Sequence, residues 1–150
     1  MAIDLHTLRR FVAADHCLAM VSLARGDGTV HTSLVNAGIT PHPVDGHPVV
    51  GLVVRGNSYK LRLAAENPRM TVAWRDGWQW ASTEGPVEIC GPEQLLEGVD
   101  PASVPTLLRT VFQDIGGTHD DWDDYDRVMA TEQRTAMFVE PERMRGVVRN

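Results

Sequence analysis

Residues 49–80 read VVGLVVRGNSYKLRLAAENPRMTVAWRDGWQW, and this run says more about the architecture than any other. It opens with an apolar stretch, 49–55, dense enough in Val and Leu to be a strand buried on both faces. Residues 58–66 have the apolar spacing of a short helix, which Asn67-Pro68 ends because a residue before proline avoids helical backbone angles. Met70, Val72 and Trp74 then alternate with other residues, as in a strand with one buried face.

Upstream of this run, the pattern predicts a short helix followed by a β-hairpin. Asp4 caps an amphipathic segment that ends near Val12. Residues 17–23 and 29–39 are strand-like and flank Arg25-Gly26-Asp27-Gly28, which has hairpin-turn chemistry. The proline-rich residues 41–48 read as a loop.

Downstream, strand patterns give way to helices and then return. Asp76-Gly77 turns the chain into a long strand over 78–89, in which Gly85-Pro86 predicts a bulge or bend. Residues 101–115 form a helix with a complete apolar stripe, ended by Gly116-Gly117, and a second short helix spans 122–129. Residues 136–148 close the fold as a strand or strand pair. We therefore expect one domain over 1–150, mainly β (α+β), with six strands forming a barrel and a few short helices.

Composition narrows the class of protein. The formal net charge of −6 argues against a surface that attracts nucleic acid or anionic lipid. No apolar run approaches the ~18 residues that span a bilayer, and the N-terminus does not resemble a signal peptide, so we expect a cytoplasmic protein. Cys17 and Cys90 lie far apart and form no C-x-x-C pair, so we expect no disulfide.

Three basic residues and a serine lie where the predicted strand 49–55 ends and the predicted helix 58–66 begins. Arg55, Ser58, Lys60 and Arg62 lie at this junction, and Lys60 is the only lysine among fourteen basic residues. A phosphate needs charge-assisted donors, and a strand-to-helix junction is a common place for them. These residues are therefore candidate phosphate contacts, although solvated charges at a strand end would give the same pattern.

The sequence contains, in this order, Arg55-Gly-Asn-Ser58-x-Lys60-x-Arg62, Asn67-Pro68-Arg69 and a strand ending in Trp74. These ordered motifs resemble those of the pyridoxamine 5'-phosphate oxidase-like split β-barrel family. The chain is closer still to the actinobacterial F420-dependent branch, the class B flavin/deazaflavin oxidoreductases. That branch has Asp-Gly-Trp, an aromatic residue, Glu-Gly and His-x-Asp-Trp-Asp-Asp-Tyr, which this sequence matches at 76–78, 80, 84–85 and 119–125.

The resemblance implies an FMN-binding type of split barrel and a homodimer with two clefts, each lined by both chains. In such a cleft the cofactor ring lies on barrel strands and its phosphate lies near the residue matched by Lys60, with Arg62 matching a second basic residue. The branch often has arginine and asparagine where this chain has Ser58 and Leu63. Ser58 is similar to the phosphate contacts of FMN-binding members, so coenzyme F420 is the expected cofactor and FMN the alternative.

Two further groups of residues are candidates for the ring. Trp78 and Trp80 are two apart on a strand and share a face, so they either line the cleft or form an apolar dimer contact. Ser33, Val35 and Asn36 could present groups to the ring from the second strand, or they could be ordinary barrel residues.

Other chemistries have little support in the sequence. The histidines form no H-x-x-x-H pair and have no accompanying cysteine, so we expect no metal site. The aspartates of 120–126 lack the pattern of a calcium loop and are better placed to stabilise a helix N-terminus. No catalytic residue can be named, because a deazaflavin carries the reactive carbon itself. We expect an oxidoreductase that transfers hydride between reduced F420 and a small unsaturated organic substrate, with an FMN-dependent enzyme or a non-catalytic F420 carrier as alternatives.

Overall fold

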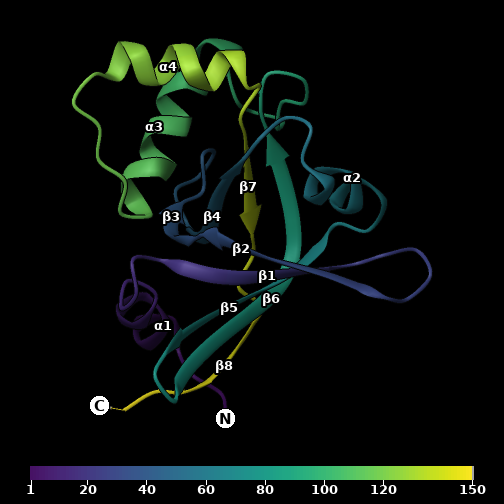
Figure 1. The fold of residues 1–150 in the computed structure, drawn as a ribbon, viewed down its shortest axis with the longest axis vertical. Coiled ribbons are helices and arrows are strands. Elements are labelled where there is room, and N and C mark those ends of the chain that lie inside the picture. The colour runs from purple at the N-terminus through teal and green to yellow at the C-terminus, as the bar shows by residue number, and fades with distance from the viewer. Residues whose placement is uncertain (150) are drawn as a thin grey trace.

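Antiparallel strands form the body of the protein in the computed structural model, which describes residues 1–149 (Figure 1). Within that range the sheet has eight strands in the order β2-β1-β5-β6-β7-β4-β3, and β8 pairs with β6. The strands are β1 Leu18–Ala24, β2 Val30–Asn36, β3 Gly38–Pro41, β4 Pro48–Val54, β5 Arg69–Asp76, β6 Gln79–Cys90, β7 Thr135–Val139 and β8 Arg143–Val147. The helices are α1 Leu5–Phe11, α2 Tyr59–Glu66, the short 3₁₀ turn η1 Pro101–Ser103, α3 Val104–Asp114 and α4 Trp122–Thr131.

The expected count of six strands is wrong, because two segments each contain a change of partner. Residues 29–39 divide at Ala37, before which β2 pairs with β1 and after which β3 pairs with β4. Ala37 is held at the division, since its N–H donates to the Cys17 carbonyl (2.8 Å) and its own carbonyl accepts the Trp74 indole N–H (2.9 Å). The C-terminal segment likewise divides into β7 and β8 around Pro141.

Strand β6 joins the two parts of the sheet. It pairs with β5 up to Pro86, with β8 over Trp80–Glu84 and with β7 from Val87 onward. The strand is unbroken at Gly85-Pro86, where it changes partners. Gly85 is required there, because a Cβ atom at this position would lie 1.8 Å from the Glu140 carbonyl oxygen.

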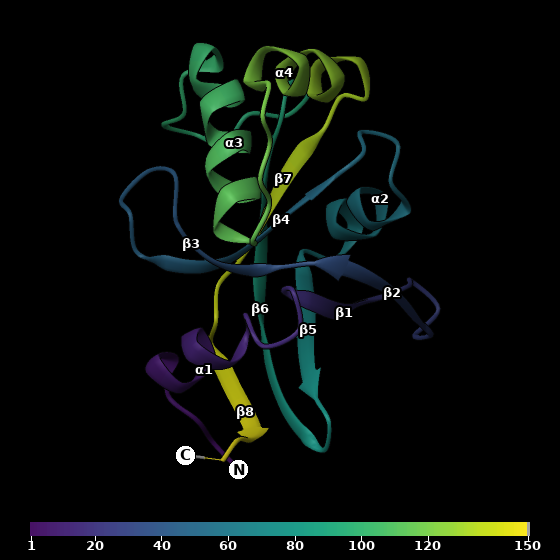
Figure 2. The same cartoon turned by 60° about the vertical axis from the view of Figure 1, so that its left-hand side comes forward.

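The core divides between the two ends of the molecule. The larger cluster lies between α1, α2 and the inner faces of the strands, and its fully buried members include Leu8, Val21, Leu52 and Val72. The smaller cluster packs α3 against β4 and β7 through Val111, Phe138 and their neighbours. Figures 1 and 2 show α3 and α4 together at one end, with α1 and both termini at the other. No helix in the described range is long and apolar enough to cross a membrane.

Candidate functional site

The junction between β4 and α2 places Arg55 before a short turn and Lys60 and Arg62 in the helix after it. The Ser58 N–H donates to the Arg55 carbonyl (3.0 Å), and the Ser58 hydroxyl then caps α2 by accepting the Lys60 N–H (3.3 Å). Asn and Ser favour this place because their short polar side chains satisfy the free N–H groups at a helix start. The cap places Lys60 in the first turn of α2, facing the edge strand β2.

Lys60 is the distinctive charge of this region. Its Nζ donates to the Ser33 hydroxyl of β2 (3.1 Å), and the side chain is half-buried. Burial lowers the pKa of the Lys60 ammonium, because the charged form is less well solvated there. No carboxylate among residues 1–149 forms an ion pair with it, so the charge is matched only by a neutral hydroxyl. An anion is the natural partner for such a group.

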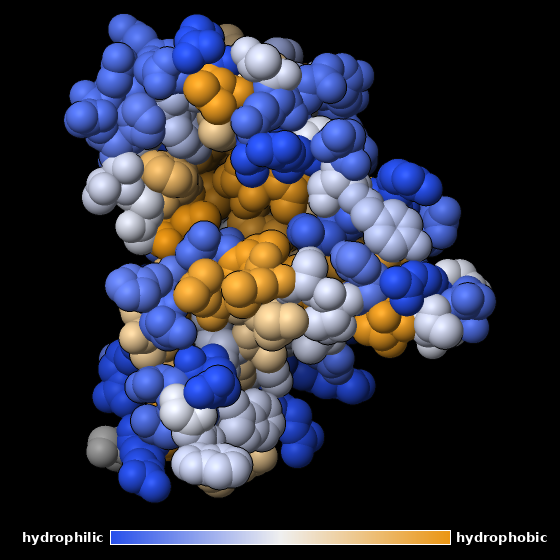
Figure 3. All heavy atoms as spheres, viewed as in Figure 1, coloured by the Kyte–Doolittle hydropathy of each residue, from blue (hydrophilic) through white to orange (hydrophobic). Residues whose placement is uncertain are grey.

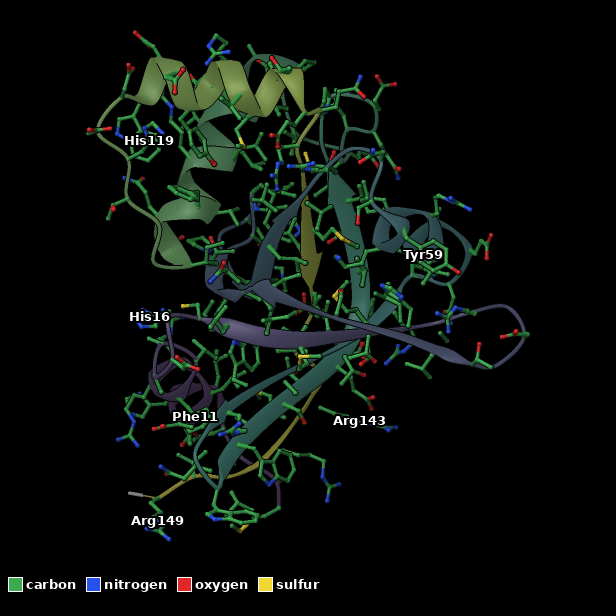
Figure 4. All side chains as sticks on the ribbon, in the orientation of Figure 1. Phe11, His16, Tyr59, His119, Arg143 and Arg149 are labelled. Atoms are coloured by element: carbon green, nitrogen blue, oxygen red, sulfur yellow. The ribbon has the colours of Figure 1, made fainter. Side chains whose placement is uncertain are left out.

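Tyr59 packs against two further basic residues, Arg25 and Arg62, and we call these three residues the basic rim. The guanidinium groups of Arg62 and Arg25 lie 5.3 Å and 5.9 Å from its ring centroid, within cation–π range. The His31 ring meets it edge-on at 5.1 Å. Figure 4 shows Tyr59 projecting from α2 beside β2. The rim therefore joins α2 to the β1–β2 hairpin and presents two guanidinium groups without ion-pair partners in the described chain.

A cavity of about 550 Å³ lies between the helical end and the strands. Its wall includes residues of the α1–β1 connection, β2, β4, the end of α3 with the turn after it, α4 and the segment just before β7. They are Ala13, His16, Cys17, Asn36, Val53, Phe112, Ile115, Gly116, Gly117, Tyr125, Met129 and Arg134. Figure 3 shows a hollow with an apolar floor on this face of the molecule, above β1 and β2. Its size falls within the 300–1,000 Å³ range usual for pockets that bind small molecules.

Polar groups on the cavity wall are already engaged. The Asn36 amide donates to the His16 carbonyl (2.9 Å), and the Tyr125 hydroxyl donates to the Leu108 carbonyl (3.2 Å). Burial raises the pKa of Tyr125 to about 12, so its hydroxyl keeps its proton. Arg134 donates to Glu132 (2.6 Å), whose pKa this contact lowers. The wall therefore offers mainly apolar surface to a ligand, and the charge of Arg134 is already paired with Glu132.

The structure places the remaining sequence candidates in different surroundings. Arg55 lies 3.6 Å from Glu132, and Val35 packs against the larger core cluster. Trp78 is 95% exposed at the β5–β6 turn, and it borders a shallow depression with Trp80. Figure 1 shows this turn at the end of the sheet away from α3 and α4, and not beside α2. Within one chain, Lys60, Ser33 and Ser58 come together, whereas the two tryptophans lie apart from them.

Sequence reasoning missed several residues that complete this region. Tyr59 stands between Ser58 and Lys60 and could have been noticed as an aromatic residue within a basic run. His31 and Arg25 could not, because only the hairpin brings them to α2. The late motif behaves as expected at its helix start: Asp121 caps α4 by accepting the Asp124 N–H (3.1 Å).

Comparison with known proteins places the fold. No protein-family model matches the chain. A conserved hypothetical protein from Mycobacterium tuberculosis superimposes with a TM-score of 0.67 at 18% identity, covering 97% of this chain and 85% of that one. An F420 reductase gives 0.61 at 14% identity, with coverage of 97% and 98%. A pyridoxamine 5'-phosphate oxidase-related, FMN-binding protein from Nostoc punctiforme gives 0.63 at 10% identity, with coverage of 94% and 79%.

These likenesses define the class of the protein by its architecture. The chain has the split-barrel fold of pyridoxamine 5'-phosphate oxidase-like and FMN-binding proteins, a fold that it also shares with an F420 reductase. At identities of 10–18% the likeness concerns the fold alone. What this chain binds has to be argued from its own residues.

Proposed function

We propose that the chain binds a phosphate-bearing deazaflavin, coenzyme F420, in a cleft of a homodimer and uses it as an F420-dependent oxidoreductase. The observation that carries this proposal is the half-buried Lys60 ammonium, which faces a neutral hydroxyl and has no carboxylate partner in the described chain. Keeping such a charge partly desolvated costs free energy, and an anionic ligand would recover it. The split-barrel fold supports a flavin or deazaflavin as that ligand.

The residues present fit the parts of such a cofactor. Lys60 and Ser58 would hold the phosphate at the start of α2, and Arg62 and Arg55 would add positive charge from either side of the junction. On β2, Ser33 contacts Lys60 and Asn36 lies on the cavity wall, with Val35 between them. These three residues would border the ring system. Trp78 and Trp80 would join the same cleft only through a second copy of the chain.

Hydride chemistry would come from the deazaflavin, whose ring carries the reactive carbon. The protein's part would be to orient the ring, to exclude water with the apolar floor of the cavity, and to balance the phosphate charge. The substrate class we propose is a small unsaturated organic molecule. No side chain is assigned as proton donor, because the Tyr125 hydroxyl is committed to Leu108.

Parallel titrations of the purified protein with F420 and with FMN test the cofactor. We expect saturable binding of both, with F420 the tighter ligand, because the Asp76-Gly77-Trp78 and His119–Tyr125 motifs resemble the F420 branch. Equal or tighter binding of FMN would favour the alternative of an FMN-dependent oxidoreductase. Absence of binding by either compound would overturn the proposal.

Turnover separates an enzyme from a carrier. Reduced F420 is mixed with the protein and a panel of small activated alkenes and quinones, and its reoxidation is followed by absorbance under anaerobic conditions. Substrate-dependent reoxidation supports an oxidoreductase. Tight binding without turnover across the panel would support a protein that stores or delivers the cofactor.

A further inference from the structure

The loop between β3 and β4 brings two histidines side by side. The His42 N–H donates to the His47 carbonyl (2.7 Å), and the Gly46 N–H donates back to the His42 carbonyl (2.9 Å). The last paired residues of the two strands are Pro41 and Pro48, so His42 and His47 follow directly on opposite sides of the hairpin. Their rings stack with centroids 4.8 Å apart and planes 15° from parallel.

Asp45 turns its carboxylate towards both rings from within the loop. Its Oδ1 lies 3.8 Å from His42 Nδ1 and is hydrogen-bonded to His47 Nδ1. One ligand atom from each of the three side chains lies within 4.8 Å of the others. Tetrahedral coordination at 2.0–2.1 Å separates ligand atoms by about 3.3 Å, so modest side-chain movement would close the set around an ion.

The outward nitrogen of each ring meets a carboxylate from a neighbouring strand end. His42 Nε2 lies 2.8 Å from Glu88 Oε1 on β6, and His47 Nε2 lies 2.7 Å from Glu140 Oε2 after β7. Histidines that bind metals usually donate their other ring N–H to a carboxylate, which fixes the tautomer and orients the ring. Both histidines have this arrangement, with Nδ1 towards Asp45 and Nε2 towards a glutamate.

The tautomer of His42 is set independently. The Val44 N–H donates to His42 Nδ1 (3.2 Å), so this nitrogen carries the lone pair and Nε2 carries the proton. A metal ion binds an unprotonated ring nitrogen, so Nδ1 is in the form that it requires. A bound ion would replace the Val44 N–H as the partner of this lone pair. The ring is also held in place, since His42 is buried and lies 6.1 Å from the Phe138 ring.

The charge of the cluster favours a cation. Three carboxylates, those of Asp45, Glu88 and Glu140, surround the two imidazoles, and no Lys or Arg within residues 1–149 forms an ion pair with any of them. With both imidazoles neutral, the two rings and the three carboxylates would carry a formal charge of −3, which a divalent cation would partly balance.

We propose that His42, Asp45 and His47 bind one divalent transition-metal ion, with zinc(II) as the preferred ion. Two imidazole nitrogens and one carboxylate oxygen are a common zinc donor set, and three protein ligands leave a fourth position for water or an exogenous ligand. Glu88 and Glu140 act as positioning residues for the two rings. The ion ties the β3–β4 loop to the ends of β6 and β7, away from Lys60, so the site is independent of the cofactor proposal. The sequence spacing concealed it, because a hairpin, not a helix, supplies the convergence.

Calorimetric titration of the untagged, chelator-treated protein with Zn²⁺ tests the site. We expect one ion per chain, and at least tenfold weaker binding in Asp45→Asn and His47→Gln. Glu140→Gln keeps all three ligands and should weaken binding roughly tenfold to a hundredfold, as loss of an orienting carboxylate usually does. Co²⁺ should give a tetrahedral visible spectrum in the wild type, which reports coordination without any substitution.

His6→Gln is the matched control, because it removes an exposed histidine on α1. It should leave Zn²⁺ affinity unchanged, and melting temperatures measured without metal show which variants remain folded. The proposal is overturned if the wild type takes up no Zn²⁺ and leaves the aqueous Co²⁺ spectrum unchanged. It is equally overturned if folded Asp45→Asn and His47→Gln bind as tightly as the wild type. In that case a protonated His47, donating from both ring nitrogens, would bridge Asp45 and Glu140 without a metal.

Discussion

At the scale of single residues, Lys60 is the most informative position. If its ammonium contacts the cofactor phosphate, Lys60→Ala removes a charge-assisted contact of about 1.5–3 kcal/mol, or roughly tenfold to a hundredfold in affinity. Lys60→Arg should restore only part of it, because a planar guanidinium cannot replace a compact ammonium at the same point. Titration of F420 by fluorescence measures both variants.

Arg9→Ala is the control for the loss of one positive charge, since Arg9 is exposed on α1, away from α2. It should leave the affinity unchanged, and raised salt should weaken the wild type more than Lys60→Ala. The melting temperature of Lys60→Ala should not fall, because the ammonium has no ionic partner to lose. Unchanged cofactor affinity in Lys60→Ala would show that the phosphate binds elsewhere.

Gly85 lets the backbone after β7 pass close to β6. Gly85→Ala introduces a Cβ 1.8 Å from the Glu140 carbonyl oxygen and 3.0 Å from its carbon, both backbone atoms that cannot move independently. We expect a loss of about 2–4 kcal/mol in the free energy of unfolding, measured by urea denaturation. Gly26→Ala, where a Cβ would meet nothing within 4 Å, should change stability little. Equal stability of the two variants would mean that β6 and the β7–β8 turn separate easily.

At the scale of elements, a forked ion pair joins α3 to α4. Arg109 donates through Nε to Asp126 Oδ1 (2.9 Å) and through Nη2 to Oδ2 (2.5 Å), and its guanidinium lies 5.4 Å from the Trp122 ring centroid. The hydrogen bonds from Arg109 lower the pKa of Asp126. Asp126→Asn should therefore lower the melting temperature by about 2–4 °C at neutral pH.

The pH dependence of this effect follows from the direction of the shift. Because the pKa of Asp126 is lower in the folded state than in the unfolded chain, the pair stabilises the fold above the unfolded value of about 3.9. That stabilisation is lost as the pH falls through the folded-state pKa. The difference in melting temperature between wild type and Asp126→Asn should be constant from pH 5 to 7 and shrink below about pH 4. A difference that persists undiminished at lower pH would point to packing, not charge.

At the scale of the whole molecule, one face of the sheet suits a second copy of the chain. Met20 pairs with Leu34 on one side and with Ala73 on the other, and Ala73 pairs with Ser82. Trp80 lies two residues before Ser82 on β6 and pairs with Val147, so all of these side chains share one face of the sheet. Leu34 is 62% exposed, and Figure 3 shows apolar surface over β1 and β2 beside the hollow. In the homodimer that we propose, Trp78 and Trp80 of one copy would reach the cleft of the other through this face.

We therefore expect a dimer by light scattering at micromolar concentration. Charges placed in this face, as in the double variant Met20→Glu and Leu34→Glu, should produce monomers and weaken cofactor binding. Val44→Glu changes an apolar residue of intermediate exposure between those two, in the β3–β4 loop, and should leave the dimer intact. A wild-type monomer would remove the basis of a cleft shared by two chains.

The sequence by itself determined most of the local elements and the position of the residues that we propose to bind the phosphate. The apolar run over 49–55 specified β4, the alternation of Met70, Val72 and Trp74 with other residues specified β5, and Asn67-Pro68 specified the end of α2. These signals depend only on neighbouring residues. The same locality places Ser58 at the helix cap and Lys60 in the first turn. The aspartates of α4 were interpreted correctly for the same reason.

Only the tertiary structure decided what meets across the chain. Ser33 approaches Lys60, and His31 approaches Tyr59, because β2 lies at the sheet edge beside α2. The division of 29–39 into two strands at Ala37 likewise depends on partners far along the sequence. The cavity is built from six separate segments, and no local pattern encodes their convergence. Contacts between distant residues depend on strand pairing and packing, which a linear pattern of residues leaves open.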